Sequence, residues 1–177
     1  MIDDVNFKDF AEQHSNPAKR RFISKSEHLY QFGKKIEGIY FCESGIVRAY
    51  TIDNETEKEN TNRFFSENEI IVPFVSLVDD VPAIVHYQVL ESGYFSFIPI
   101  ETWKILKEQE PNLASKILLK MSTDTYRRSY TYQNNCRYDT QTRRNLLLEQ
   151  YPYLRRVPDE YIASFLAVAR RTLLRNK

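Results

Sequence analysis

The stretch AIVHYQVLE, from Ala83 to Glu91, decides how the first half of the chain folds. In this stretch the apolar side chains of Val85, Tyr87 and Val89 alternate with polar ones. A repeat of two residues is typical of a β-strand that turns one face to the core and the other to solvent. We therefore expect a half-buried strand here.

Further short apolar or alternating runs lie on both sides of that strand, between Arg21 and Pro99. They are RFI, HLYQF, GIYFCES, GIVRAYTID, NRFF and GYFSFIP. Turn residues separate these runs, and no helical pattern lies between them. Several short strands in such an order are typical of an antiparallel β-roll or jelly roll. With the helices that follow, the sequence predicts an α+β fold.

Helical patterns begin after Pro99. From Asn112 to about Cys136 the chain has neither Gly nor Pro, and Leu113, Ile117 and Met121 recur at helical spacing, which predicts a long helix. Beyond Met121 the stripe becomes polar and aromatic, so that a regular heptad seam is not sustained. Pairing of this helix with a second copy and packing on its own roll both stay open.

The closing segment has the pattern of a helix-turn-helix. It reads VPDEYIASFLAVARRTLLRNK, from Val157 to Lys177, and follows a shorter predicted helix, TQTRRNLLLEQ. The apolar contacts between its two helices would come from Ile162, Ala163, Leu166, Val168 and Leu173. The second helix would begin near Ala169 and present Arg170, Arg171, Thr172, Arg175 and Lys177 to a major groove. A packed amphipathic helix pair without a DNA role fits the same pattern.

Composition supports a folded chain with a basic end. Of the 177 residues, 42% are hydrophobic and 28% charged, enough to bury a core, and the formal net charge is +1. Residues 137–177 carry nine basic and four acidic side chains, whereas the first 136 residues carry 16 and 20. A basic end is typical of nucleic-acid binding, and equally of a solvated basic helix.

Several other classes of protein are disfavoured. The opening MIDDVNFKDF has acidic residues where a secretory signal needs basic ones, and IIVPFVSLV is far shorter than the roughly 20 residues of a membrane helix. We therefore expect a soluble cytoplasmic protein without a membrane partner, with Cys42 and Cys136 reduced. His14, His28 and His86 stand far apart, and no catalytic motif occurs, so neither a metal site nor an enzyme is expected.

Three stretches of the chain resemble a known family. They are YFCESGIVRAY (Tyr40 to Tyr50), FFSENEIIVPFVSLVDDVPA (Phe64 to Ala83) and LEQYPYLRRVPDEYIASFL (Leu148 to Leu166). With the order of roll, long helix and helix-turn-helix, they are similar to the Crp/Fnr family of bacterial transcription regulators, in its short Bacteroidetes form. The resemblance implies a cyclic-nucleotide-binding-like sensor roll over residues 1–110, a dimerisation helix over 111–137 and a truncated helix-turn-helix domain without a wing over 138–177.

The ligand motif of that family does not carry over. Members that bind cyclic AMP hold the ribose with a Gly-Glu pair and the cyclic phosphate with an Arg followed by Ser or Thr. These pairs align with Val72–Pro73 and Pro82–Ala83. Each lost hydrogen bond to a charged group costs roughly 1.5 to 3 kcal/mol, so cyclic AMP is expected to bind weakly or not at all.

No cofactor is therefore predicted. The roll would either bind a different effector or bind no effector at all. The candidate pocket residues are Val72, Pro73, Phe74, Pro82 and Ala83. Arg48 and Arg63 are further cations of the strands that could neutralise an anionic effector, but we expect both to face solvent.

The DNA-reading segment also departs from the family pattern. Ala167 replaces the Gly of the turn, Ala169 replaces the capping Ser or Thr, and Arg171 replaces a Glu that contacts bases, while Arg175 matches the family's Arg. Losing a helix cap costs about 1 kcal/mol. The second helix would therefore be short, and its affinity for DNA would depend mainly on phosphate contacts.

The resemblance implies a homodimeric transcription regulator whose partners are double-stranded DNA, a second copy of the chain and, as a further candidate, RNA polymerase. The alternative is a ligand-sensing or protein-interaction module of the same fold with a vestigial DNA-binding end. The acidic run DNETEKEN, from Asp53 to Asn60, predicts a hydrated hairpin tip whose charge would keep that edge away from DNA.

Overall fold

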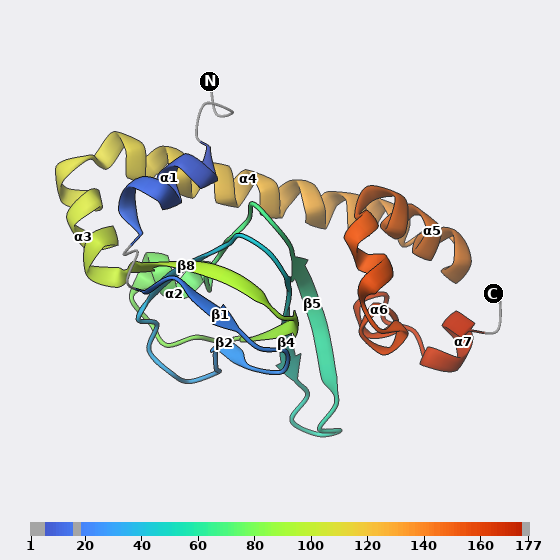
Figure 1. Ribbon diagram of the computed structural model, residues 1–177. Helices are drawn as coiled ribbons and strands as arrows, with labels where there is room; N and C mark the ends of the chain where they lie inside the picture. The colour runs from blue at the N-terminus through green and yellow to red at the C-terminus, as the bar shows by residue number, and fades with distance from the viewer. Residues whose placement is uncertain (1–5, 16–18, 175–177) are drawn as a thin grey trace. The chain divides into compact units, whose positions relative to one another are not determined.

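The computed structural model describes residues 6–15 and 19–174 of the chain (Figure 1). The chain divides into two compact units. One consists of Met1–Ala49 and Phe64–Thr123, and the other of Tyr50–Arg63 and Asp124–Lys177. We call the first the roll unit and the second the helical unit. The expected division into residues 1–110, 111–137 and 138–177 stays a prediction.

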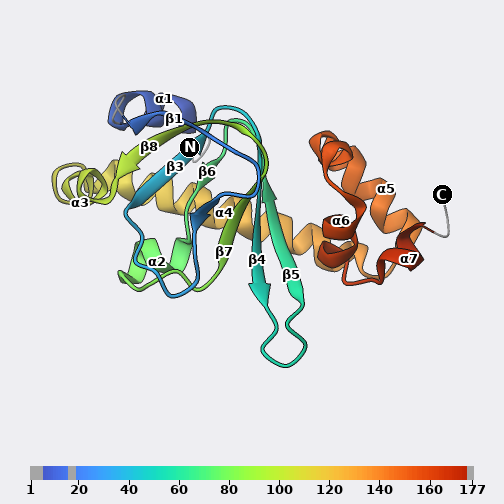
Figure 2. The same cartoon turned by 60° about the horizontal axis from the view of Figure 1, so that its bottom comes forward.

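The strands form two four-stranded sheets, ordered β1-β8-β3-β6 and β2-β7-β4-β5 (Figure 2). The strands are β1 Arg21–Ile23, β2 His28–Tyr30, β3 Gly38–Cys42, β4 Ile46–Ile52, β5 Glu59–Phe65, β6 Ile70–Ile71, β7 His86–Glu91 and β8 Gly93–Pro99. Strand β8 pairs antiparallel with β1 and β3, β3 pairs with β6, and β2 pairs with β7. The predicted α+β fold with an antiparallel β-roll is confirmed.

The core of the roll unit follows the alternation seen in the sequence. Strand β7 begins at His86, and its Tyr87 and Val89 are buried, as predicted, while Val85 lies just before the strand and is half-buried. Phe95 and Ile98 of β8 are buried in the same core. At roughly 1.5 to 3 kcal/mol for each large apolar side chain, this burial is the main force that holds the roll together.

Helices precede, interrupt and follow the roll. They are α1 Phe7–His14, α2 Phe74–Asp79, α3 Ile100–Gln109, α4 Pro111–Asn135, α5 Thr140–Gln150, the 3-10 helix η2 Pro152–Arg156, α6 Asp159–Phe165 and α7 Arg170–Leu174. The long helix expected from Asn112 to about Cys136 is α4, and the predicted TQTRRNLLLEQ helix is α5. Within the described residues, no helix combines the length and the apolar character needed to cross a bilayer.

The first half of α4 packs on the chain's own roll. Ala114 and Ile117 are buried in the core, and Leu113 and Met121 pack against it. The apolar stripe read from the sequence is therefore used inside this protomer. Leu119, Tyr126 and Tyr130 lie elsewhere on the helix and are exposed.

Two glycines allow the hairpins of the roll to meet closely. Gly45, in the motif from Tyr40 to Tyr50, has a φ of +106°, which side chains rarely permit, and a Cβ there would lie 2.7 Å from the carbonyl oxygen of Glu91. A Cβ on Gly93 would overlap the main chain of Ser44. Only glycine fits either position without a shift of the backbone.

Candidate nucleic-acid interface

Helices α6 and α7 form the predicted helix-turn-helix within the helical unit. Ile162 and Ala163 of α6, Leu166 of the turn and Leu173 of α7 are buried, as the sequence predicted. Val168 is half-buried. Leu147, Leu154 and Val157 are also buried in this region of the chain. Apolar contact therefore fixes two helices that are too short to be stable alone.

The turn between the helices closes with a complete set of main-chain hydrogen bonds. The amide of Val168 donates to the carbonyl of Ala163 over 3.0 Å, and the amide of Ala167 donates to that of Ser164 over 3.0 Å. These bonds define a Schellman motif, in which the residue after the cap is left-handed and usually Gly. Here that residue is Ala167, with a φ of 55°. The turn thus has the left-handed backbone conformation that glycine usually adopts, and the alanine at this position is strained.

Helix α7 presents two of the predicted DNA-binding arginines. Arg170 and Arg171 are exposed, and Thr172 is half-buried. The helix runs for only five residues, and its first bonds run from the amides of Thr172 and Leu173 to the carbonyl of Ala169. Because the alanine at 169 has no side-chain oxygen, it supplies no cap. The remaining two predicted contacts, Arg175 and Lys177, lie outside the described residues.

Two arginines of α5 hold α6 at both of its ends, and sequence analysis did not assign them this role. Arg144 forms a partly buried ion pair with Asp159 in the first turn of α6, with 3.3 Å between Nη2 and Oδ1. Arg143 donates from Nη2 to the carbonyl oxygen of Leu166 over 2.7 Å. The pair of arginines in TQTRRNLLLEQ was the only signal of this in the sequence.

Aromatic contacts tie this arrangement to the end of α4. The ring of Tyr132 meets that of Phe165 edge to face at 5.4 Å, and the guanidinium of Arg143 lies 5.7 Å from the Tyr132 ring centroid. Helix α5 starts with an N-cap, since Asp139 accepts from the amides of Gln141 and Thr142. A further hydrogen bond from the Thr142 hydroxyl is the main reason that the pKa of Asp139 is lowered.

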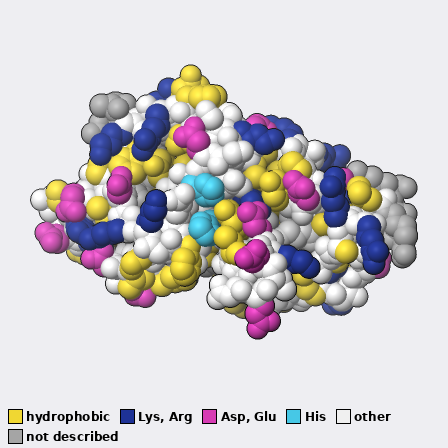
Figure 3. Space-filling view, turned by 90° about the horizontal axis from the view of Figure 1, so that it is seen from below, with side chains coloured by type: hydrophobic (Ala, Val, Ile, Leu, Met, Phe, Trp, Pro, Cys, Tyr) yellow, Lys and Arg dark blue, Asp and Glu magenta, His cyan; other side chains and the backbone are white. Residues whose placement is uncertain are grey.

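The exposed charge around these helices is mixed. Arg155 and Arg156 of η2 and the arginines of α7 are exposed, whereas Glu160 of α6 is an exposed acid. On the face drawn in Figure 3, Lys and Arg side chains are scattered rather than gathered into one patch. That face therefore shows no broad basic footprint of the kind that favours phosphate binding.

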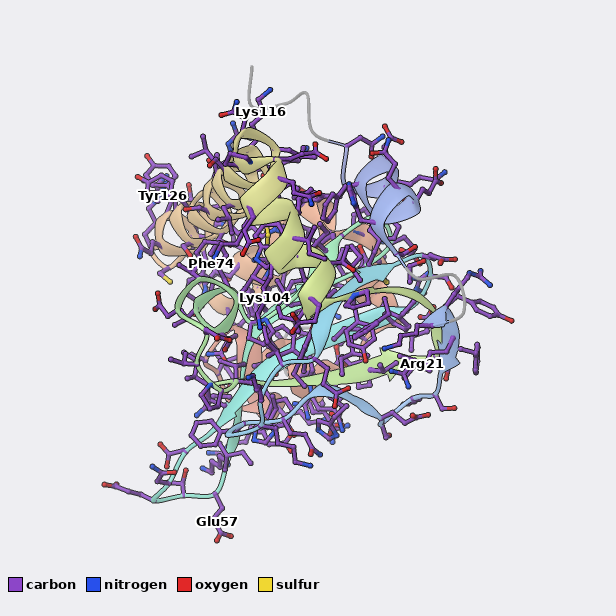
Figure 4. All side chains as sticks on the ribbon, turned by 90° about the vertical axis from the view of Figure 1, so that its left-hand side faces the viewer. Arg21, Glu57, Phe74, Lys104, Lys116 and Tyr126 are labelled. Atoms are coloured by element: carbon purple, nitrogen blue, oxygen red, sulfur yellow. The ribbon has the colours of Figure 1, made fainter. Side chains whose placement is uncertain are left out.

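The predicted effector residues lie together on the segment that joins β6 to β7. Val72, Pro73 and Ala83 are buried, and Pro82 is exposed. Phe74, at the start of α2, is half-buried (Figure 4). None of these side chains can pair with a phosphate. The segment is held by a hydrogen bond of 3.1 Å from the hydroxyl of Ser76 to the carbonyl of Pro82.

Tyrosines occupy the interior of the roll beside this segment. The hydroxyl of Tyr30 donates to the carbonyls of Gly38 and Ile71 at 2.7 and 3.1 Å, and that of Tyr87 donates to Val72 at 3.2 Å. The Tyr30 and Tyr87 rings meet edge to face at 5.3 Å. Burial raises the pKa of Tyr30 well above its usual value, so this phenol stays neutral.

The expectation that Arg48 faces solvent is wrong. Arg48 is 1% exposed, and both its Nε and Nη2 donate to Oε1 of Gln88, at 3.0 and 2.7 Å. The strand pattern could not show this, because both faces of β4 are buried at this point. Arg63 is half-buried and donates to the hydroxyl of Thr125 over 2.9 Å, so it does not face solvent freely either.

The sequence suggested that the three histidines stand far apart, but the structure brings two of them together. Pairing of β2 with β7 brings the rings of His28 and His86 to 6.0 Å between centroids. Over residues 6–15 and 19–174, no cluster of three or more His, Cys, Asp or Glu side chains could hold a metal ion.

The chain is similar to known proteins in sequence and in fold. No family model matches the chain. The fumarate and nitrate reduction regulatory protein of Yersinia pestis is 26% identical over 104 residues. The match covers 59% of this chain and 40% of that protein, so this chain spans less than half the length of that relative.

Solved structures share the fold over most of the chain. FixK2 from Bradyrhizobium japonicum has a TM-score of 0.73 at 16% identity, covering 89% of this chain and 81% of that one. The c-di-GMP-responsive global regulator CLP of Xanthomonas campestris has 0.72 at 16% identity, covering 96% and 87%. A protein from Eubacterium rectale, described as a transcriptional regulator of the Crp/Fnr family, has 0.72 at 17% identity, covering 98% and 82%. The resemblance inferred from the sequence is thereby confirmed.

Proposed function

Since the chain resembles the Crp/Fnr regulators in sequence and shares their fold, we propose that it is a transcription regulator that binds double-stranded DNA through α6 and α7. The observation that carries this proposal is the pair Arg170 and Arg171, exposed on a helix whose opposite face is anchored by the fully buried Leu173. In helix-turn-helix proteins the second helix enters the major groove and the first crosses the DNA backbone. No enzymatic role is proposed, and a DNA-binding role would place the protein in the cytoplasm.

The proposed regulator acts as a homodimer joined along α4. Leu119, Tyr126 and Tyr130 are 49%, 70% and 57% exposed, although each carries a large apolar surface. The first two are seven residues apart and the third follows after four, the spacing of a heptad seam. The rings of Tyr126 and Tyr130 are stacked with 6.3 Å between centroids, and Tyr126 projects outward from the helix (Figure 4).

Two-fold symmetry along α4 would set two α7 helices at half-sites about 34 Å apart, one turn of DNA. Sedimentation tests the seam: Tyr126→Glu should yield monomers, because two like charges would face each other there. Tyr94→Glu, at an exposed tyrosine of β8, is the matched control and should stay dimeric. A dimeric Tyr126→Glu variant would contradict this seam.

The sensor roll is proposed to respond to an effector other than cyclic AMP, or to none. Val72, Pro73, Pro82 and Ala83 offer no charge to a phosphate, and the carbonyls of Ile71 and Val72 already accept hydrogen bonds from Tyr30 and Tyr87. A thermal-shift series with cyclic AMP and cyclic di-GMP tests this. A ligand at 100 times its Kd adds about 2.7 kcal/mol of stability, so binding would be seen as a clear rise in Tm.

The decisive experiment is selection of bound duplexes from a random pool, followed by a salt titration with the selected duplex. Four phosphate contacts in a dimer, from Arg170 and Arg171 of each copy, predict a slope of log K against log salt of about −4. Arg171→Ala should weaken binding and reduce the slope by about two. Lys107→Ala, at the exposed end of α3, is the control that should bind as the wild type does. No complex with any duplex at low salt would refute the proposal.

The second candidate is a ligand-sensing or protein-interaction module with a vestigial DNA-binding end. The strained Ala167 and the uncapped, five-residue α7 favour it. A dimer that gains Tm with a metabolite yet ignores the random pool would have this function. If DNA is bound, transcription in vitro with purified RNA polymerase would show whether the polymerase is a partner and whether the regulator activates or represses.

A further inference from the structure

A serine of the first helix of the helix-turn-helix is bonded to the edge of strand β5. The amide of Thr61 donates to the hydroxyl oxygen of Ser164 over 2.9 Å, and the same hydroxyl donates to the carbonyl of Glu59 over 2.9 Å. All three residues belong to the helical unit. One side chain thus joins segments 103 residues apart in the sequence.

The two main-chain groups that Ser164 binds lie on the side of β5 that faces away from β4. Strand β5 ends its sheet, and in an extended strand the carbonyl of one residue and the amide of the second residue after it point the same way. Such edge groups are normally paired, covered or left to water. Ser164 satisfies both with one hydroxyl, in the position that a further strand would take, and Thr61 is buried.

The hairpin that ends in β5 carries an acidic tip. Its acids are the exposed Glu55, Glu57 and Glu59 and the half-buried Asp53, against the single cation Lys58. The tip is ordered, since Asp53 accepts from the amide and the hydroxyl of Thr56, both at 2.7 Å. The hydroxyl bond is the main cause of a lowered pKa of Asp53, which keeps this carboxylate ionised. Glu57 projects from the far end of the hairpin (Figure 4).

We propose that this hairpin is an autoinhibitory clamp: Ser164 holds its acidic tip beside α6, where it repels the DNA backbone. The inference rests on the proposed DNA-binding function. The first helix of a helix-turn-helix crosses the DNA backbone, so a hairpin bonded to α6 lies beside the path of the phosphates. At most about 15 Å of chain separates Glu55 from the contact at Glu59, which exceeds the Debye length of about 8 to 10 Å at physiological salt. The acids therefore repel the phosphates chiefly at low salt, where the Debye length is longer.

Release of the clamp should strengthen DNA binding. Ser164→Ala removes both hydrogen bonds while keeping a small helix-forming residue in α6. We expect the full-length variant to bind a duplex of about three turns roughly tenfold more tightly at about 50 mM salt, with a smaller gain at about 200 mM because salt screens the acids. Ser129→Ala, at an exposed serine of α4, is the matched control and should leave the affinity unchanged.

A structural readout follows the clamp without DNA. In the wild type the Thr61 amide should be protected from hydrogen exchange, and Ser164→Ala should remove that protection while the amides of the roll core keep theirs. This measurement shows that the substitution opened the contact rather than unfolding the protein.

Charge variants test the contribution of the acidic side chains separately from the Ser164 contact. Glu55→Gln with Glu57→Gln should tighten DNA binding, whereas Glu108→Gln with Glu110→Gln, at exposed positions around the end of α3, should have little effect. If the acids act only while the clamp is closed, the tip substitutions add little when combined with Ser164→Ala. This non-additivity distinguishes a clamp from a general change in net charge.

The outcomes separate the two proposals. Loss of Thr61 protection together with tighter DNA binding supports the clamp. If Thr61 protection is lost while the affinity stays unchanged or falls, the clamp is refuted and DNA binding stands. A Thr61 amide as unprotected in the wild type as in Ser164→Ala also refutes the clamp alone. If neither protein binds DNA at low salt, the proposed function fails and the clamp with it.

Discussion

Arg143 donates a hydrogen bond of 2.7 Å from its guanidinium to the main-chain carbonyl of Leu166. Leu166 follows the last residue of α6, so this bond satisfies one of the carbonyls that a helix leaves open at its end. The donor comes from α5, and its guanidinium also lies over the ring of Tyr132. The turn of the helix-turn-helix is thus positioned by a helix outside the motif.

Replacing this arginine should loosen the turn. Arg143→Ala removes a charge-assisted hydrogen bond, and we expect a loss of about 1.5 to 3 kcal/mol in the free energy of unfolding of the helical unit, measured by urea denaturation. DNA affinity should fall as well, because α7 would no longer be held. Arg137→Ala, at an exposed position before α5, should change neither. Equal stability of the two variants would show that the bond to Leu166 contributes nothing.

Relief of the strain at Ala167 should stabilise the protein. A residue other than Gly costs roughly 1 to 2 kcal/mol in the left-handed region, and Ala167 has a φ of 55°. We expect Ala167→Gly to raise Tm by about 2 to 4 °C, measured by calorimetry. Ala163→Gly, in the middle of α6, should lower Tm instead, because glycine weakens a helix interior. A fall in Tm for Ala167→Gly would mean that the turn is not left-handed in solution.

The cap at the start of α5 should make the stability of the helical unit depend on pH. The pKa of Asp139 is lowered in the folded chain, chiefly by the hydroxyl of Thr142, so the carboxylate stabilises the fold above its ordinary pKa of about 3.9. That contribution is lost as the pH falls through the lower folded-state value. Asp139→Ala should therefore be less stable than the wild type at pH 7.

Urea denaturation at several pH values, followed by circular dichroism, measures this difference. The gap between wild type and Asp139→Ala should narrow as the pH falls below about 4. Asp124→Ala, which replaces an aspartate inside α4, controls for the loss of one negative charge. A gap that stays constant down to acid pH would show that Asp139 does not cap the helix as an anion.

The tyrosine hydroxyls inside the roll should be needed for stability. Tyr30→Phe leaves the buried carbonyls of Gly38 and Ile71 without this donor, and we expect a loss of about 1 to 3 kcal/mol in the free energy of unfolding. Tyr94→Phe, at an exposed tyrosine of β8, is the matched control and should stay within about 0.5 kcal/mol of the wild type. An undiminished stability of Tyr30→Phe would mean that water or a shift of the backbone replaces the hydroxyl.

Local pattern was sufficient for most elements and for the motif at the end of the chain. It missed α1, and the expectation that no helix lies between the strands is wrong, because α2 lies between β6 and β7. Alternation around Val89 predicted the strand that became β7, and helical spacing from Leu113 to Met121 predicted α4. The apolar positions of the helix-turn-helix were predicted as well, since a tight crossing of two helices constrains residues that are close in sequence. Of the predicted DNA contacts, Arg170 and Arg171 are exposed as expected.

Local sequence pattern could not predict contacts between segments that lie far apart in the sequence. The sequence determined most of the residues that form strands and helices and which faces are apolar, because those depend on neighbours within one or two turns of chain. Only the tertiary structure decided that Arg48 is buried against Gln88, that Arg143 holds the carbonyl of Leu166, and that Ser164 bonds to the edge of β5. A polar side chain has the same local signature whether it meets water or a main-chain group 103 residues away, and folding alone brings the second partner within 3 Å.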